Sequence, residues 1–278
     1  MSSMLNINQL ARKENLVIHL DASVANYTAY EFNSGSRNGT NASVLDWPNR
    51  WTDLSGNNNN VYPIYTTSTD NTTGITAYNS SFYNITSSYL DNSVEIVGSG
   101  VNTLTDKAFR FNPIQETTGP LSIFMWVKLS STVSGGYYWI AQKRGQGQTT
   151  NSLFWNIICS TARNFIIELY NSSAGVAAAH TFSTTANLNT WYQVGFTVDN
   201  STAGSRCNFY FNGQVVSSGT LSSNMNVGSR QIILGRPDWA STNIRSRFWL
   251  SQFLVYNAAL TSQEVWDNYQ ITKYKHQI

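Results

Sequence analysis

The chain has 278 residues and a net charge of +2, with 41% hydrophobic and only 12% charged residues. This length and apolar content suit one large folded domain. Lysine and arginine form no run that could neutralise a phosphate backbone, which argues against nucleic-acid binding. No apolar stretch approaches the ~18 residues of a membrane-spanning helix. The N-terminus shows no apolar signal-peptide core. Polar, uncharged surfaces are typical of virion, cell-surface and extracellular proteins, so we expect such a location.

Two cysteines, Cys159 and Cys207, lie in predicted strands. They form either an inter-strand disulfide or two small buried hydrophobic residues, and the sequence leaves both interpretations open. Neither a CxxC nor an HxxxH spacing occurs, so we expect no zinc site.

Four polar segments lie outside the predicted core. Residues 1–14 are an N-terminal arm of thin apolar content, which we expect to dock on a neighbouring subunit or to fray. Polar insertions are predicted at about 23–48 and 61–100, and loops of this length are usually functional or disordered. The basic tail at 273–276 is expected to be a solvated end.

The first strand is predicted at residues 15–22, where apolar residues alternate with others. A period of two places Leu16, Ile18 and Leu20 on one face of this strand. The residues between them then share the opposite face.

A turn is predicted at residues 50–60, RWTDLSGNNNN. Asp53 and Ser55 can bond nearby backbone N–H groups, and Trp51 can anchor the turn inward. The glycine and asparagine run tolerates left-handed backbone conformations.

The clearest strand patterns lie at 121–129 and 191–199. In the second, the residues from Tyr192 to Val198 alternate between an apolar and a more polar face. Asn212-Gly213 then sits between two apolar runs, and this pair readily adopts the positive φ angles of a tight two-residue hairpin turn. The predicted hairpin spans 208–216, and further strands are predicted at 93–97, 108–112, 137–141, 153–158, 165–170, 230–236 and 249–260.

A short helix is predicted at 261–269, close to the C-terminus. Thr261 followed three residues later by Glu264 is the pattern of a capping box, which marks a helix start.

These patterns together resemble a known family. WYQVGFTVD and NFYFNGQVV, with RWTDLSG, NLVIHLDA and IILGR, resemble the laminin-G-like, concanavalin A-like lectin and glucanase domains, in versions found in phage and large-virus proteins. The resemblance covers most of residues 15–270. It implies an all-β, two-sheet antiparallel jelly-roll sandwich with a short C-terminal helix, built as one domain at 15–278.

The resemblance also raises an enzymatic alternative, because glucanases share this fold. They carry an ExDxxE strand motif that supplies paired carboxylates, about 5 Å apart in retaining enzymes, and this motif is absent here. Glu264 and Asp267 are better explained by helix capping and a solvated face. His19 lies beside Asp21 on one strand face, which could orient an imidazole, but no GxSxG pattern accompanies it. We therefore expect no enzymatic activity, and a glycoside hydrolase is the weakest alternative.

Glycan binding is the leading functional prediction. Sugars stack on aromatic faces, while polar side chains fix their hydroxyl groups. Trp51 and Tyr138 are aromatic residues predicted outside the core pattern. Arg236, Asp238 and Trp239 follow a strand end and could form a clamp at the rim, unless Trp239 packs on its own loop. The expected ligand-binding set is Arg236, Asp238, Trp239, Tyr137 and Trp47.

Calcium is a further expectation from the resemblance, since laminin-G-like domains often hold Ca²⁺ at the rim. The ion takes six to eight oxygen ligands. Asp53, Asn57 and Asn59 could supply some of them and Asp21 or Asp199 others, although the spacing is not that of an EF-hand.

The sequence therefore predicts a non-catalytic binding or interaction module that recognises a glycan or a surface. The alternative is a structural subunit of a virion capsid or fibre, which would use the lectin-like fold for assembly and residues 1–14 for contact with a partner subunit.

Overall fold

The computed structural model describes most of the predicted core. The described residues are 10–22, 51, 53–59, 61–64, 93–97, 108–111, 114–115, 119–130, 136–144, 153–171, 175–201, 204–226, 229–235 and 247–276. The insertion predicted at 23–48, most of the one at 61–100, and residues 1–9 of the predicted arm lie outside these ranges.

The first of two antiparallel sheets has seven strands in the described part of the chain. Their order is β1-β15-β6-β11-β12-β13, with β3 paired beside β15. The strands are β1 (Leu16–Asp21), β3 (Val94–Val97), β6 (Leu121–Leu129), β11 (Trp191–Val198), β12 (Arg206–Phe211), β13 (Gln214–Thr220) and β15 (Arg247–Tyr256).

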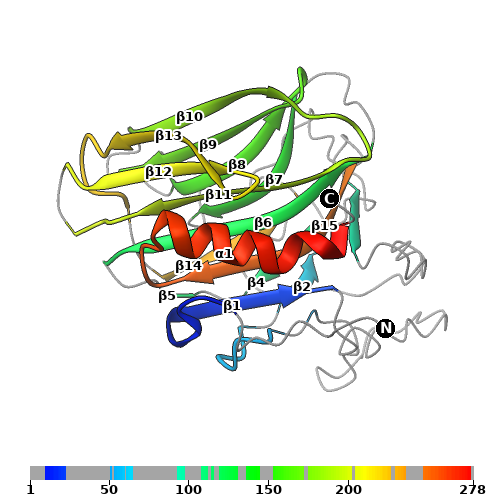
Figure 1. Cartoon of the computed structure of the whole chain (residues 1–278), viewed down its shortest axis with the longest axis horizontal. Coiled ribbons are helices and arrows are strands. Elements are labelled where there is room, and N and C mark those ends of the chain that lie inside the picture. The colour runs from blue at the N-terminus through cyan, green and yellow to red at the C-terminus, as the bar shows by residue number, and fades with distance from the viewer. Residues whose placement is uncertain are drawn as a thin grey trace, which may run out of the picture.

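The second sheet has eight strands within the same ranges, in the order β10-β9-β8-β7-β14-β4-β2, with β5 paired to β14. The strands are β2 (Val61–Ile64), β4 (Ala108–Phe111), β5 (Ile114–Gln115), β7 (Tyr137–Arg144), β8 (Leu153–Ser160), β9 (Asn164–Tyr170), β10 (Val176–Thr185) and β14 (Ser229–Leu234). The two sheets stack face to face, which confirms the predicted two-sheet sandwich (Figure 1).

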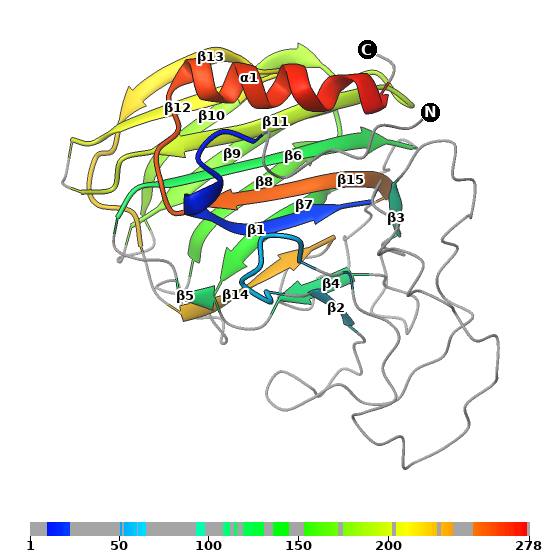
Figure 2. The ribbon, with the colours of Figure 1, turned by 60° about the horizontal axis from the view of Figure 1, so that its bottom comes forward.

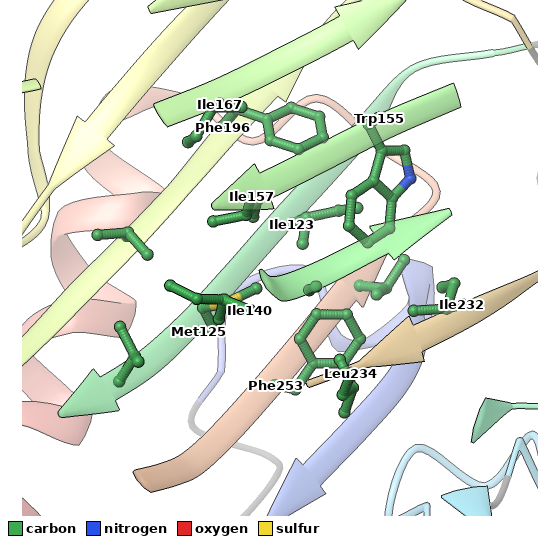
Figure 3. Close-up of a cluster of buried hydrophobic side chains, with 14 of the residues drawn as sticks. Ile123, Met125, Ile140, Trp155, Ile157, Ile167, Phe196, Ile232, Leu234 and Phe253 are labelled. Carbon is green, nitrogen blue, oxygen red and sulfur yellow. The ribbon is translucent and has the colours of Figure 1, made fainter. Parts of the chain in front are cut away.

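The main core fills the space between the sheets. Along β6, Ile123, Met125 and Val127 point into this core, while Phe124 and Trp126 belong to clusters on the opposite side of the sheet. This is the alternation that the sequence predicts. Side chains from β7, β8, β9 and β14 meet them from the second sheet (Figure 3). Burial of each large apolar side chain stabilises the fold by roughly 1.5–3 kcal/mol.

The Asn212-Gly213 hairpin is confirmed between β12 and β13. Asn212 has φ 50° and Gly213 has φ 75°, so both central residues are left-handed. Asn212 also accepts a hydrogen bond from the Gln193 N–H through its side chain, at 2.9 Å, and donates its own N–H to the Gln193 carbonyl at 2.8 Å. The turn is therefore fixed to β11 as well as to its own hairpin.

The predicted facing of β1 is wrong at its first residue. The pairing register with β15 shifts between Leu16 and Ile18, which is a β-bulge. Because the bulge adds one residue, Leu16 joins a second cluster on the outer side of the seven-stranded sheet, and Val17 packs against the main core. Ile18 and Leu20 face the main core as predicted.

The C-terminal helix α1 (Ser262–Lys273) lies across the outer face of the seven-stranded sheet (Figures 1 and 2). Its capping box is confirmed: Glu264 N–H donates to Thr261 Oγ1, and Thr261 N–H donates to Glu264 Oε2. A 3₁₀ turn, η6 (Tyr274–His276), follows the helix.

Residues 10–14 of the predicted arm dock on this same helix of their own chain. Ala11 N–H donates to Asn268 Oδ1 at 2.8 Å, and Arg12 Nε lies 2.6 Å from Glu264 Oε1. Leu10 is buried in the cluster beneath the helix. For these residues the expectation of docking on a neighbouring subunit or fraying is wrong, because the α1 surface already binds them.

Candidate functional site

The outer face of the eight-stranded sheet carries a strip of aromatic and polar side chains. Tyr138, Ile140, Trp155 and Ile157 point into the core, so Tyr137, Trp139 and Asn156 point outward. The register of β7 shifts between Trp139 and Ala141, and Ile140 and Ala141 both enter the core, so the outward side resumes at Gln142. Register then aligns Gln142 with Asn156 and Asn156 with Glu168 across β7, β8 and β9. We call this set the outer-face strip: Tyr137, Trp139, Gln142, Asn156, Glu168 and Tyr170.

A carboxylate is the centre of the polar half of the strip. Glu168 Oε2 accepts hydrogen bonds from Asn156 Nδ2 at 2.8 Å and from the Tyr170 hydroxyl at 2.6 Å. Asn156 is buried, and its Oδ1 has no hydrogen-bond partner among the described residues. Asn156 therefore supports the Glu168 carboxylate from beneath and is itself covered.

Aromatic rings form the other half of the strip. The Tyr137 and Trp139 rings lie 6.5 Å apart in an edge-to-face arrangement, and the Tyr137 side chain is 43% exposed. Trp139 pairs with Ile158 on β8, and Ile158 is the next residue after Asn156 on the same outer face. Exposed aromatic faces beside fixed acceptors are the combination that binds the apolar and hydroxyl faces of a sugar.

The strip holds one carboxylate in the part of the sheet that the structure describes. Retaining glycoside hydrolysis needs two, about 5 Å apart. Glu168 is also already bonded to two neighbours. Held by these two bonds, the Glu168 carboxylate is suited to orienting a bound ligand.

Tyr137 lies in the strip, so the structure places one predicted ligand residue there. Trp47, Arg236, Asp238 and Trp239 lie outside the described residues. Trp51 and Tyr138, considered as aromatic residues outside the core, are both buried in the main cluster, which confirms the inward anchoring predicted for Trp51. Trp51 pairs with Val61 in an isolated bridge, and Tyr138 points inward from β7.

Asn156, Glu168 and Tyr170 were missed by sequence reasoning. Their signal is a single polar residue inside an apolar strand, as in LFWNIICS and FIIELY. Such a residue indicates a polar position on one sheet face, but only the register between strands shows that the two positions are adjacent.

The predicted calcium residues form a cap over the free edge of β1. Asp53 accepts from the His19 N–H at 2.8 Å, the Ser55 N–H at 2.9 Å and the Asn59 N–H at 2.9 Å. Asn57 Nδ2 donates to the Leu16 carbonyl, and Asn59 Nδ2 donates to the Val17 carbonyl, each at 2.8 Å. These contacts satisfy backbone groups that an edge strand would otherwise expose.

Calcium binding at Asp53, Asn57 and Asn59 stays a prediction. Within the described ranges, no three His, Cys, Asp or Glu side chains gather as a metal site.

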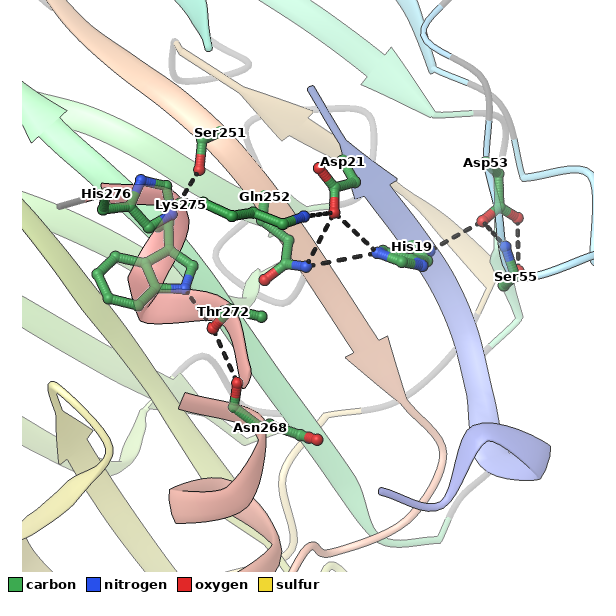
Figure 4. Close-up of polar contacts among 11 residues, drawn as sticks. His19, Asp21, Asp53, Ser55, Ser251, Gln252, Asn268, Thr272, Lys275 and His276 are labelled. Atoms are coloured by element: carbon green, nitrogen blue, oxygen red, sulfur yellow. Dashed lines mark hydrogen bonds and ion pairs between the residues drawn. The ribbon is translucent and has the colours of Figure 1, made fainter. Parts of the chain in front are cut away.

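A second polar cluster lies under the end of the chain, on the outer face of the seven-stranded sheet (Figure 4). His19 Nε2 lies 3.6 Å from Asp21 Oδ2, and Gln252 Nε2 lies 3.4 Å from each of them. Lys275 forms an ion pair with the same Asp21 oxygen. The predicted adjacency of His19 and Asp21 is confirmed, but their side chains are only 1% exposed, which excludes direct contact with a substrate in this conformation.

The prediction of a solvated basic tail is wrong for Lys275 and His276, although Tyr274 between Lys273 and Lys275 is exposed. The Lys275 side chain is 8% exposed, and His276 is buried against Trp126 and Trp191. Sequence reasoning missed this because the carboxylate that receives Lys275 lies 254 residues earlier in the chain.

Cys159 and Cys207 are free thiols, both buried. Burial raises the pKa of Cys159 to about 12, opposed by the nearby Arg163 charge, and burial also raises the pKa of Cys207. Thiols of this kind behave as small apolar side chains.

Comparison with known proteins places this geometry in context. A sequence model of the concanavalin A-like lectin/glucanases superfamily matches residues 98–266, more than half of the chain. No curated protein sequence matches the chain. Within the described residues, no helix has the length and apolar character needed to cross a membrane.

Several solved binding domains share the fold. The binding domain of botulinum neurotoxin DC, solved in complex with rat synaptotagmin II, is 14% identical with a TM-score of 0.59, over 94% of this chain and 52% of that one. The binding domain of Paraclostridial Mosquitocidal Protein 1 is 16% identical with a TM-score of 0.59, over 92% and 52%. The receptor binding domain of botulinum neurotoxin D is 16% identical with a TM-score of 0.55, over 94% and 53%. The chain thus spans about half the length of each of these solved chains.

Proposed function

The chain belongs to the concanavalin A-like lectin/glucanases superfamily, and from this we propose that it is a non-catalytic binding module whose ligand is a glycan held on the outer-face strip. The observation that carries the proposal is the 43% exposed Tyr137 ring, edge-to-face with Trp139 on the same outer face as the Glu168 carboxylate. Trp139 pairs with Ile158, which is two residues along β8 from Asn156, the residue bonded to Glu168.

Each part of the strip has a defined role in this proposal. The Tyr137 and Trp139 rings receive the C–H face of a sugar ring. Glu168 accepts hydrogen bonds from its hydroxyl groups. Asn156 and Tyr170 hold Glu168 in position. The similar solved structures are binding domains, which agrees with a binding role without chemistry. The proposed Ca²⁺ site at Asp53, Asn57 and Asn59 is separate from the strip and is not needed for this function.

The proposal is tested on an array of neutral, sialylated and sulfated glycans, probed with the purified chain in Ca²⁺ and again in EDTA. We expect a defined neutral or acidic glycan to be retained in both conditions. Tyr137→Ala should then weaken binding of that glycan about tenfold, the equivalent of ~1.4 kcal/mol. Tyr274→Ala is the matched control, because Tyr274 is equally exposed, at 47%, on the other side of the molecule. No retained glycan, or equal affinities of the two variants, would reject the outer-face strip as a glycan site.

We propose assembly through protein contacts as the second function, in line with a structural subunit of a virion or a cell-surface complex. Edge strand β13 has neither a charged residue nor a proline, and it exposes Val215 and Val216. Edges without such protection are open to pairing with another chain. Sedimentation of the wild-type chain and of Val216→Lys tests this proposal. Assembly of the wild type that the lysine abolishes supports it. A wild type that stays monomeric at high concentration contradicts it.

A further inference from the structure

Glu168 is the charged residue of the outer-face strip, and its partners are uncharged. The buried Asp21 carboxylate is neutralised by Lys275. Glu168 instead accepts hydrogen bonds from two neutral groups, the Asn156 amide and the Tyr170 hydroxyl. Among the described residues no cation pairs with Glu168, so the strip carries a negative charge that the chain does not compensate.

The two donors bind one oxygen of this carboxylate and leave the other open. Both hydrogen bonds end on Glu168 Oε2, at 2.8 Å from Asn156 Nδ2 and 2.6 Å from the Tyr170 hydroxyl. Oε1 accepts no hydrogen bond within the described part of the chain, and it is not buried. A carboxylate that is fixed at one oxygen and open at the other is a pre-organised acceptor for a donor on a ligand.

Strand β10 leaves the approach to this oxygen open. Register places Ala179 of β10 opposite Glu168, and Thr181 opposite Ile166. Both of these β10 residues are small and exposed, and β10 contains no Asp, Glu, Lys or Arg. The neighbours of Glu168 on this strand are therefore neither bulky nor charged.

The aromatic end of the strip lies too far from Glu168 for one sugar ring to touch both. Trp139 pairs with Ile158, and Ile158 pairs with Ile166. Glu168 is two residues from Ile166 along β9, so Trp139 is two strands and one two-residue step away, about 12 Å between Cα atoms. The same spacings place Tyr137 about 17 Å from Glu168. A ligand that touches both ends is therefore a chain of sugar rings, with the two isoleucines beneath it.

The single carboxylate decides which charge that chain carries. The other members of the strip are uncharged. A sugar carboxylate or sulfate would bring a like charge next to Glu168, which is unfavourable. A sugar ammonium adds the attraction of opposite charges to its hydrogen bond with Oε1, and such bonds are roughly twice as strong as neutral ones.

We propose that the ligand of the outer-face strip is a basic oligosaccharide, a chain of two or more sugar rings with an unacetylated amino group. The amino group binds Glu168 Oε1, and the far end of the chain stacks on the Trp139 and Tyr137 rings. The proposal rests on the glycan-binding function proposed above and narrows its ligand: a neutral chain binds more weakly than its amino form, and acidic chains are excluded.

Calorimetric titration of the full chain with defined sugars tests the proposal at about pH 6, where sugar amines are protonated. The probes are the tetramer of glucosamine, its neutral N-acetylated form, the tetramer of galacturonic acid, and the glucosamine monomer. We expect the glucosamine tetramer to bind about tenfold more tightly than its acetylated form, and the acidic tetramer and the monomer to show no binding. Equal affinities of the amino and acetylated tetramers overturn the proposal. Binding of the acidic tetramer, or of the monomer as tightly as the glucosamine tetramer, also overturns it.

Glu168→Gln identifies the charge, because glutamine keeps an acceptor for Asn156 and Tyr170 but is neutral. This variant should lose the preference for the amino tetramer, whereas Asp267→Asn, at an exposed aspartate of α1, should keep it. A preference that survives in Glu168→Gln, or that Asp267→Asn also removes, refutes the role of Glu168. If Glu168→Gln fails to fold, Ala179→Lys decides, since it adds an ammonium at the exposed position opposite Glu168. A preference that remains in Ala179→Lys refutes the proposal.

Failure of this proposal differs from failure of the glycan function itself. If the acetylated tetramer binds as well as the amino one and Tyr137→Ala weakens both, the strip remains a glycan site and only the basic ligand is rejected. If no sugar binds here or on the glycan array, both proposals are rejected.

Discussion

Lys275, three residues from the end of the chain, forms a buried ion pair with Asp21 on the first strand. The contact joins the two ends of the described chain on the outer face of the seven-stranded sheet, and the Gln252 amide adds a further donor. It fixes the path of the chain after α1, which neither the helix cap nor the apolar pattern specifies.

Asp21→Asn should destabilise the fold strongly, because it leaves the Lys275 ammonium buried without its counter-charge. Removal of one partner from a buried pair costs about 3–5 kcal/mol. Urea unfolding at pH 7 measures this, with Asp199→Asn as the control at an exposed aspartate. The double variant Asp21→Asn/Lys275→Met should recover much of the loss, and equal stabilities of the single and double variants would contradict the pairing.

The same pair predicts an acid dependence. The pKa of Asp21 is lowered in the folded state, so its contribution is fully present above the unfolded-state value of about 3.9. It is lost as the pH falls below that value towards the folded pKa. The stability difference between wild type and Asp21→Asn should therefore be constant from pH 7 to pH 5 and shrink below about pH 4. A difference that stays constant down to pH 2 would show that Asp21 is not perturbed.

Asp53→Ala should destabilise the chain in EDTA as well as in Ca²⁺. The substitution leaves the His19 and Asn59 N–H groups without their acceptor. Each unsatisfied buried group costs about 1–3 kcal/mol. Thermal unfolding in both buffers checks this, with Asp267→Ala, at an exposed aspartate of α1, as the control. Destabilisation that appears only in Ca²⁺ would mean that the carboxylate serves a metal and not the β1 edge.

Gly213→Ala should loosen the contact between the β12–β13 hairpin and α1. An added Cβ would lie 2.7 Å from Tyr269 Cβ and Cγ, on a backbone with φ +75°. Gly204→Ala is the matched control, because its φ is +84° but nothing lies within 4 Å of the added atom. We expect about 1–3 kcal/mol more loss at Gly213, typical of overpacking. If chemical unfolding shows equal losses of stability in the two variants, the loss comes from backbone strain alone. That result would contradict a close approach between Gly213 and Tyr269.

Both cysteines should be reduced and slow to react. Raised thiol pKa values leave little thiolate at pH 8, and both side chains are buried. A thiol reagent should therefore modify neither cysteine quickly in the native chain and both in denaturant. A native mass two hydrogens below the reduced mass would instead show a disulfide between Cys159 and Cys207.

Local sequence was sufficient to predict the elements that depend on residues close together in the chain. The alternation in 121–129 and 191–199 correctly predicted which side chains of β6 and β11 share a face. Asn212-Gly213 predicted its turn, and Thr261 with Glu264 predicted the start of α1. In each case the determinant is a backbone preference or a hydrogen bond within a few residues.

Strand β10 was not predicted, for a physical reason. Val176–Thr185 is rich in Ala, Ser and Thr, and as an edge strand most of its side chains are exposed, so it lacks an apolar period of two. Its pairing with β9 makes it a strand. The bulge at Val17 was not predicted either, because a bulge is defined by the pairing register with β15.

The sequence by itself determined the fold class, the main core strands, the hairpin turn and the helix start, because periodicity and turn chemistry act over short distances along the chain. The tertiary structure alone decided the outer-face strip, the burial of Lys275 and His276, and the use of Asp53 to cap β1. Those arrangements join residues from separate strands, and a side chain's partner across a sheet depends on register and strand order, which no local pattern encodes.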